Sequence, residues 1–145
     1  MGHGIRERIA FCRMDVYGLR QFNKQISIEV LRNEMGNIYK ICDADLWDSA
    51  EKLGRFTGAE IDVKDGFIHF STADQLADTL RLHFAGRVGL HLITVDASLL
   101  DIQWEPARSG DLFPHLYADL PLSAVRSVDP LPLGSDGLHQ LPSQL

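Results

Sequence analysis

The sequence predicts a small single α+β domain, in which about two helices pack against a mixed sheet of short strands. Strand-forming residues alternate over residues 38–42, and apolar residues recur at helical spacing after Ser71. Residues 88–95 are apolar on both faces of a strand, which is typical of the centre of a sheet. The 145 residues, 45% of them hydrophobic, suffice for one buried core.

The net charge differs between the first 36 residues and the rest of the chain. Residues 1–36 hold six Lys/Arg and four Asp/Glu, a net charge of +2, whereas residues 37–145 hold eight and sixteen, a net charge of −8. Two alternatives stay open for residues 1–36: an amphipathic helix, or a frayed and disordered N-terminal extension. We expect the functional domain at residues 37–128, followed by a tail of proline and glycine at residues 129–145.

The first half of the domain begins with the strand at residues 38–42. A helix is expected over residues 43–54, because Asp43 or Asp45 can cap its start and Gly54 can end it. Residues 55–64 form a turn-rich link, and a turn at residues 65–66 leads into a strand at residues 67–70.

The second helix is expected to begin at Ser71 as its N-cap and to end at Gly86. Its apolar stripe consists of Ala73, Leu76, Ala77, Leu80 and Phe84. After the strand at residues 88–95 we expect a short helical turn at 96–100 and a strand at 102–104. A proline-containing loop at 106–114 and a last strand at 122–128 complete the domain.

Composition excludes several classes of protein. The net charge of −6 disfavours long nucleic acids as partners, because little charge is available to neutralise phosphates. No apolar run approaches the length of a membrane span, and residues 1–8 lack the apolar stretch of a secretion signal. Cys12 and Cys42 form no CxxC pair, so we expect a reduced, cytoplasmic protein.

The segment of residues 65–73, DGFIHFSTA, is the most informative one. Alternation along its strand places His69 and Ser71 on one face, and the strand delivers Ser71 and Thr72 to the start of a helix. An imidazole and hydroxyls beside free helix N–H groups can bind a hydroxyl, a carboxylate or a phosphate. The alternative is that Ser71 only caps the helix and His69 is a core histidine.

A second cluster lies at Trp104 and Glu105, followed by His115 and Tyr117. Aromatic, carboxylate, imidazole and phenol groups gathered near a loop are typical of a binding site. The alternative is that the aromatic residues pack in the core and Glu105 is solvated. No histidine pair has zinc-ligand spacing, so we expect no metal, and motifs of dehydrogenases, P-loop proteins and α/β-hydrolases are missing from the sequence.

Several motifs occur together in one order: Ile38-Tyr-Lys-Ile, Trp47 with Ala50, Gly54 and Gly58, Asp65-Gly-Phe-Ile-His-Phe-Ser-Thr-Ala73, Val95-Asp96, Trp104-Glu105 and Phe113-Pro-His-Leu-Tyr117. Over about residues 37–128 this pattern resembles the domain-of-unknown-function 952 family of small bacterial proteins. The resemblance implies a fold like that of ADP-ribosyltransferases and brings no established activity.

A more distant similarity is to RNA 2′-phosphotransferases of that fold group. Ile68-His69-Phe70, a helix and an apolar strand ending at Asp96 follow the same order, so the resemblance implies that His69 contacts NAD⁺ or a terminal phosphate. At the first strand, where many such transferases have Arg or His, this chain has Tyr39 and Lys40.

The chemistry that this similarity implies is loss of nicotinamide from NAD⁺, with NAD⁺ as a substrate and no certain cofactor. The ring would stack on Tyr117 or Trp104, His69 and Ser71 would hold ribose hydroxyls or the amide, and Lys40 would face a phosphate. Glu105 would stabilise positive charge or accept a proton.

Two other functions stay open. The same residues serve equally as recognition groups in a non-enzymatic module that binds a small metabolite or a protein segment, and a scaffold that works only by contact is the third alternative. None of the three functions, transferase, binding module or scaffold, predicts an oligomeric state. The catalytic candidates His69, Glu105 and His115 are expected to line one cleft with Ser71.

Overall fold

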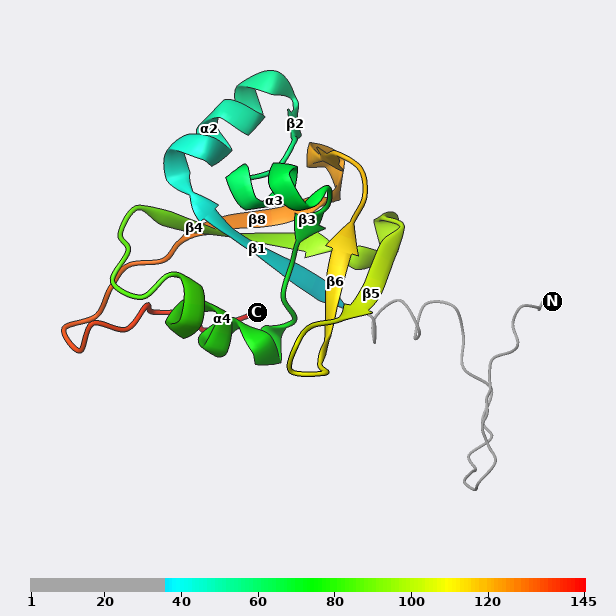
Figure 1. The fold of residues 1–145 in the computed structure, drawn as a ribbon. Coiled ribbons are helices and arrows are strands. Elements are labelled where there is room, and N and C mark those ends of the chain that lie inside the picture. Colours follow the sequence, from blue (N-terminus) through cyan, green and yellow to red (C-terminus); the bar gives the residue numbers. More distant parts are fainter. Residues whose placement is uncertain (1–35) are drawn as a thin grey trace. The chain divides into compact units, whose positions relative to one another are not determined.

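A three-stranded antiparallel sheet forms the centre of residues 36–145, the part of the chain that the computed structural model describes (Figure 1). Its strands are β1 (Asn37–Asp43), β4 (Leu90–Asp96) and β8 (Val125–Pro130), in the order β1-β4-β8. The apolar run at residues 88–95 therefore does form a central strand, as predicted. The expected N-terminal helix or extension lies outside the described residues.

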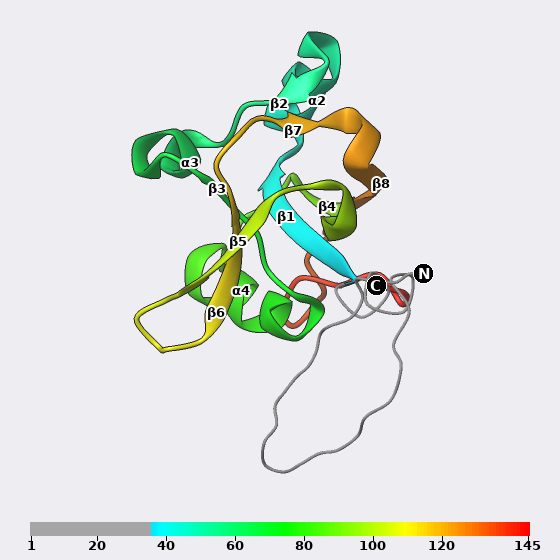
Figure 2. The same cartoon turned by 90° about the vertical axis from the view of Figure 1, so that its right-hand side faces the viewer.

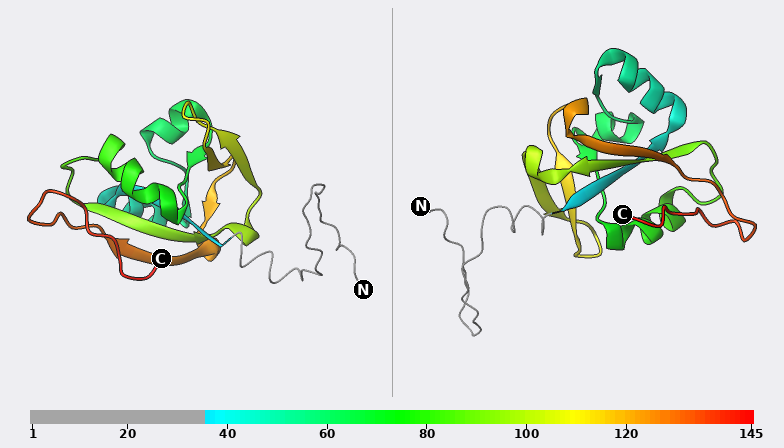
Figure 3. Two further views of the ribbon diagram at one scale, coloured as in Figure 1. Left: turned by 90° about the horizontal axis from the view of Figure 1, so that it is seen from below. Right: turned by 180° about the vertical axis from the view of Figure 1, so that it is seen from behind.

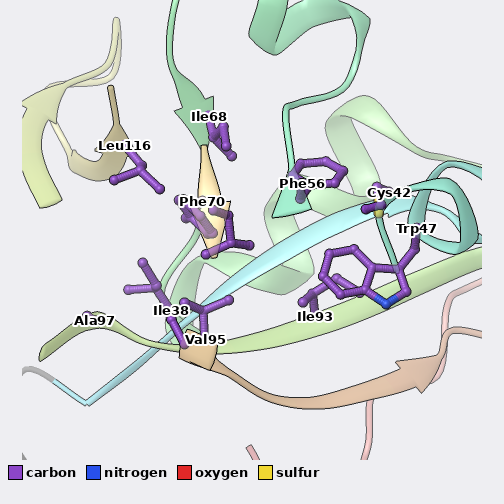
Figure 4. Packing of buried hydrophobic residues seen from close by; sticks show 13 residues of the cluster. Ile38, Cys42, Trp47, Phe56, Ile68, Phe70, Ile93, Val95, Ala97 and Leu116 are labelled. Carbon is purple, nitrogen blue, oxygen red and sulfur yellow. The ribbon is translucent and has the colours of Figure 1, made fainter. Parts of the chain in front are cut away.

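Both faces of the central sheet are covered, because successive side chains of a strand point to opposite faces. In Figures 1 and 3, α2 (Ala44–Leu53) lies on one side of this sheet and α4 (Leu76–His83) on the other. The core on the α2 side, shown in Figure 4, includes Ile38, Cys42, Trp47, Phe56, Ile68, Phe70, Ile93, Val95, Ala97 and Leu116. The core on the α4 side consists of Tyr39, Ile41, Leu76, Leu80, Leu90, Leu92 and Leu131.

Helix α2 has the predicted extent. Asp43 precedes it in extended conformation, and Gly54 ends it with φ 91°, a left-handed conformation that glycine adopts without steric cost. Trp47 and Ala50 are its buried residues, and the Trp47 ring packs 5.6 Å from that of Phe56.

The expected link at residues 55–64 contains two elements that the sequence did not indicate. β2 (Arg55–Phe56) pairs with β7 (Leu120–Pro121), and α3 (Glu60–Asp65) follows. Helix α3 has no apolar stripe, because Ile61 and Val63 are exposed and its buried residue is Asp62. The count of α-helices in the described residues is therefore three, not two.

Ser71 does not cap the next helix. β3 (Ile68–His69) is followed by a single bridge in which Ser71 exchanges both backbone hydrogen bonds with Tyr39, at 2.8 and 2.9 Å. This pairing keeps Ser71 extended, so the 3₁₀ turn η2 (Ala73–Gln75) begins after Thr72, and α4 follows it. Leu76 and Leu80 of the predicted stripe are buried, whereas Ala73 and Ala77 are exposed.

The expected loop at residues 106–114 is shorter in the structure. β5 (Ile102–Pro106) and β6 (Leu112–Leu116) form an antiparallel hairpin, and only residues 107–111 connect them (Figure 2). Pro106 and Pro114 both lie within these strands. The carbonyl of Pro114 accepts a hydrogen bond from the Phe70 amide across the sheet. β3 pairs with β6, which gives a second three-stranded sheet in the order β3-β6-β5.

Two 3₁₀ turns complete the fold. η3 (Ala97–Leu99) stands at the predicted turn and is capped by the Asp96 side chain, which accepts from the Ser98 amide at 3.0 Å. The start of the expected last strand is instead η4 (Leu122–Ala124), after which β8 begins. Strand pairs in all three sheets are antiparallel, so the expected single mixed sheet is replaced by three antiparallel ones.

Candidate functional site

The sheet β3-β6-β5 presents chemistry-bearing residues on one face, which we call the outer face. Register places His69 opposite His115 and His115 opposite Gln103, while Glu105 lies opposite Phe113. Cross-strand partners point to the same side of a sheet, and so do residues two apart in a strand. The other face carries Ile68, Leu116 and Ile102, which pack in the core.

On the β5–β6 hairpin, Glu105 holds His115. A Glu105 carboxylate oxygen lies 2.6 Å from Nδ1 of His115, and the Tyr117 hydroxyl donates to both carboxylate oxygens at 2.9 and 3.1 Å. The hydrogen bonds from His115 and then Tyr117 lower the pKa of Glu105, and the same bond raises the pKa of Tyr117. We call these three residues the Glu105 triad.

On the neighbouring strand, His69 lies between two carboxylates of α3. Its Nδ1 is 2.7 Å from Oδ1 of Asp62, and its Nε2 is 3.1 Å from Oδ2 of Asp65. The His69 side chain is 34% exposed, so it lies at the surface and is not a core histidine. Asp62, by contrast, is 1% exposed.

The buried carboxylate of Asp62 is stabilised from several directions. Oδ2 lies 2.6 Å from Nζ of Lys40 and accepts from the Ala59 amide at 2.7 Å, while Oδ1 also accepts from the His69 amide at 3.1 Å. Burial alone would raise the pKa of Asp62, but the bonds from His69, Lys40 and Ala59 outweigh it and lower the pKa to about 2. Burial lowers the pKa of Lys40, an effect that Asp62 partly offsets.

Phe67 joins the two halves of the site. Its ring stacks on His115 at 4.2 Å between centroids and packs against His69 at 4.6 Å and Tyr117 at 5.1 Å. The two imidazole centroids are 5.4 Å apart. His69, Glu105, His115 and Tyr117 thus lie in one cluster at the surface.

The other predicted site residues lie elsewhere. Tyr39 is 3% exposed and belongs to the core on the α4 side. Ser71 is buried, and its hydroxyl lies 3.1 Å from that of Thr79 on α4. Thr72 precedes η2, where its amide donates to the side chain of Gln75 at 2.9 Å. Ser71 therefore does not line a cleft with His69.

Lys40 and Trp104 are separated from the outer face for different reasons. Lys40 was expected to face a phosphate, but its ammonium is buried against Asp62. Trp104 lies opposite Pro114, one residue out of step with Glu105, so it points to the other face of the sheet. A ring stacked on Trp104, as the sequence suggested, would therefore not lie on the outer face with His115 and Tyr117.

Three residues of the site were not singled out from the sequence: Asp62, Asp65 and Phe67. The signal for Asp62 was indirect. A lysine within a strand whose neighbours are apolar on both sides requires a buried carboxylate partner, and Lys40 is such a residue. Phe67 shares the predicted face of His69 by alternation.

Within residues 36–145, no group of three or more His, Cys, Asp and Glu side chains has an arrangement that would hold a metal ion. The described helices include none with the length and apolarity needed to cross a membrane.

Comparison with known proteins matches this chain to a family and to solved structures of a relative. A crystal structure of protein CC0527 from Caulobacter crescentus is 43% identical, with a TM-score of 0.69, and the match covers 72% of this chain and 94% of that one. A solution NMR structure of the same protein is 42% identical, with a TM-score of 0.68, and covers 75% and 96%. No curated protein matches the chain.

The family model that matches is described as "Protein of unknown function (DUF952)", and it spans residues 41–128. That range contains β1 from its fifth residue, the whole outer face and most of β8. The outer face, Asp62 and Asp65 therefore lie inside the matched region, and Lys40 stands one residue before it. This chain belongs to the DUF952 family, as the sequence motifs indicated.

Proposed function

We propose that this protein is a cytoplasmic transferase that acts on a nucleotide-like ligand, with His115 as the proton-transferring group. The observation that carries the proposal is the Glu105 triad, in which the 2.6 Å contact between Glu105 and His115 is supported by the Tyr117 hydroxyl. A histidine oriented by a carboxylate is the usual arrangement for general acid–base catalysis.

The geometry leaves one nitrogen of His115 free for chemistry. Because the pKa of Glu105 is lowered, its ionised carboxylate accepts the proton of Nδ1, which makes Nε2 the basic atom. Among residues 36–145 this Nε2 has no hydrogen-bond partner, and the His115 side chain is 13% exposed. It is therefore positioned to accept a proton from a bound hydroxyl or water.

Charge in the cluster favours a reaction in which positive charge develops. Asp62, Asp65 and Glu105 carry three negative charges against one on Lys40, a net charge of −2 with neutral imidazoles. Cleavage of a ribosyl bond develops such charge on the sugar, where a nearby carboxylate stabilises it. The exposed carboxylates of Asp65 and Glu105 are suited to this role.

With NAD⁺ as the substrate, nicotinamide would leave with the electron pair of its bond to the ribose. The oxygen of an acceptor hydroxyl or of water would bond to the same ribose carbon, and its proton would pass to Nε2 of His115. The half-exposed ring of Tyr117 offers a stacking surface for the departing ring. This proposal includes an ADP-ribosyltransferase-like fold. It also includes the resemblance of residues 68–70 to RNA 2′-phosphotransferases.

A non-enzymatic binding module is the second candidate. Both ring nitrogens of His69 face carboxylates, so this histidine is better suited to recognition than to taking a proton from a bound ligand. Phe67, His115 and Tyr117 would then form a recognition surface for a small metabolite. Turnover, rather than affinity, separates the two candidates.

The first experiment measures thermal shifts of the full chain with NAD⁺, NADP⁺ and a 2′-phosphorylated RNA oligonucleotide at millimolar concentration. Any ligand that binds is then incubated with the protein, and its products are identified by mass spectrometry. No shift with all three ligands removes the support for a transferase. Binding without any product supports the binding module.

Variants assign the roles if a product is found. Glu105→Gln should retain affinity and lose turnover about 100-fold or more, since a neutral amide no longer stabilises the protonated histidine. Glu60→Gln is the matched control, because Glu60 is exposed and lies outside the triad. Equal activity of Glu105→Gln and Glu60→Gln would exclude the proposed role of Glu105.

A further inference from the structure

The sequence placed Lys40 in ligand binding and left Asp62 unassigned, but the structure joins them in one buried pair beneath His69. Both side chains are almost fully buried, at 5% and 1% exposure, so neither can contact a ligand directly. The pair reaches a side chain at the surface through the 2.7 Å contact between Asp62 Oδ1 and His69 Nδ1.

The direction of that hydrogen bond follows from the charge on Asp62. An ionised carboxylate only accepts hydrogen bonds, so Nδ1 of His69 carries a proton and donates it. The Asp62 carboxylate cannot turn away, because the Ala59 and His69 amides and the Lys40 ammonium hold its two oxygens. With Nδ1 fixed as the donor, the unprotonated nitrogen of the neutral ring is Nε2.

The second carboxylate faces this nitrogen. Oδ2 of Asp65 lies 3.1 Å from Nε2, and the Asp65 side chain is 36% exposed. When Nε2 is protonated it donates to Asp65. The ring of His115, 5.4 Å away, and the ring of Phe67 are its other neighbours at the surface.

Local backbone geometry is consistent with a site built around Asp62. A Cβ atom at Gly58 would lie 2.9 Å from Cβ of Asp62, and Gly58 has φ +114°. The chain can pass this close to Asp62 only without a side chain at that position.

We propose that Asp62, neutralised by Lys40, is the positioning residue of the site: it fixes His69 with Nδ1 protonated and directs Nε2 towards Asp65 and the surface. This inference goes beyond the proposed function, in which His115 and not His69 transfers the proton. Asp62 itself touches no ligand, and Lys40 acts through Asp62.

The test is ¹⁵N NMR of the histidine rings in the full chain, across the range in which histidine titrates, about pH 5 to 8. We expect the neutral form of wild-type His69 to carry its proton on Nδ1. A neutral form with the proton on Nε2 would overturn the proposal without any variant.

Two variants separate Asp62 from Asp65. The double variant Asp62→Asn with Lys40→Met removes both buried charges together, and we expect loss of the Nδ1-protonated preference of His69 while the His115 signals stay unchanged. Asp65→Asn, at a partly exposed position, should keep that preference. Asp78→Asn, which removes an exposed charge that pairs with Arg81, is the control and should change neither ring.

The outcomes decide between the alternatives. If the double variant is folded and its His69 tautomer is unchanged, or if Asp65→Asn alone switches the tautomer, Asp62 is not the positioning residue. If the double variant does not fold, the wild-type tautomer and Asp65→Asn still decide. None of these measurements requires turnover, so a protein without activity can confirm the positioning role, and an active protein can refute it.

Discussion

Removing one charge of the buried Lys40–Asp62 pair tests whether this ion pair stabilises the fold. Lys40→Met keeps most of the apolar stem of the side chain and removes the ammonium that lies 2.6 Å from Asp62. The carboxylate then stays buried at 1% exposure with amide and imidazole donors only. Loss of one partner of a buried pair costs about 3–5 kcal/mol, and we expect a loss of stability in this range.

The double variant Lys40→Met with Asp62→Asn should cost less than the sum of the two single variants, because no unpaired charge is left in the interior. Urea unfolding followed by circular dichroism measures all four proteins, and the fluorescence of buried Trp47 gives a second probe. A Lys40→Met loss below about 1 kcal/mol, or strict additivity of the two single losses, would refute the assignment of a buried ion pair.

Acid gives an independent measure of the same pair. The pKa of Asp62 falls from its ordinary 3.8 to about 2 on folding, which corresponds to about 2 kcal/mol of stability. Because the pKa is lowered, this stability is fully present above pH 3.8 and is lost as the pH falls towards 2. The Asp62→Asn variant should lack this part of the acid dependence, and an unchanged acid profile would contradict the lowered pKa.

Three further predictions concern other parts of the fold. Gly58→Ala should lower the free energy of unfolding by about 1–3 kcal/mol more than Gly54→Ala, since both glycines have positive φ but only Gly58 would bring its Cβ within 2.9 Å of Asp62; equal losses in thermal unfolding would show that crowding is relieved. Phe56→Ala should cost about 3–5 kcal/mol, because Phe56 is 1% exposed and packs on Trp47, whereas Leu112→Ala at an exposed position should change stability by about 0.5 kcal/mol or less; similar losses in urea would contradict the assigned core. Burial raises the pKa of Cys42 to about 12, so alkylation of the peptide that contains Cys42 should follow global unfolding in denaturant, and rapid labelling of the native protein would contradict its burial.

The sequence predicts best where a local pattern decides the structure. The strand at β1, the helix that ends at Gly54 and the central strand β4 each have a periodicity or a terminating residue of their own. The sequence also grouped His69, Glu105, His115 and Tyr117, and the structure brings these side chains together; their role in a site stays a prediction.

Features that depend on distant partners were not predictable in this way. Asp62 resembles any surface acid until Lys40 of β1 and His69 of β3 are brought to it. Ser71 resembles an N-cap until its backbone pairs with Tyr39. The face on which Trp104 lies is decided by the register between β5 and β6. Residue propensities predict a strand or a loop but not the register.

The short strand β3 has a consequence for the motions of this protein. Two residue pairs, Ile68 with Leu116 and His69 with His115, join β3 to β6, and the Phe70 amide adds one hydrogen bond to the Pro114 carbonyl. The Glu105 triad is contained within one hairpin, whereas His69 is tied to α3 and, through Asp62, to β1. A local opening of this two-pair ladder would separate the imidazoles while each stays bound to its own carboxylate, so amide hydrogen exchange at β3 should be faster than at β4.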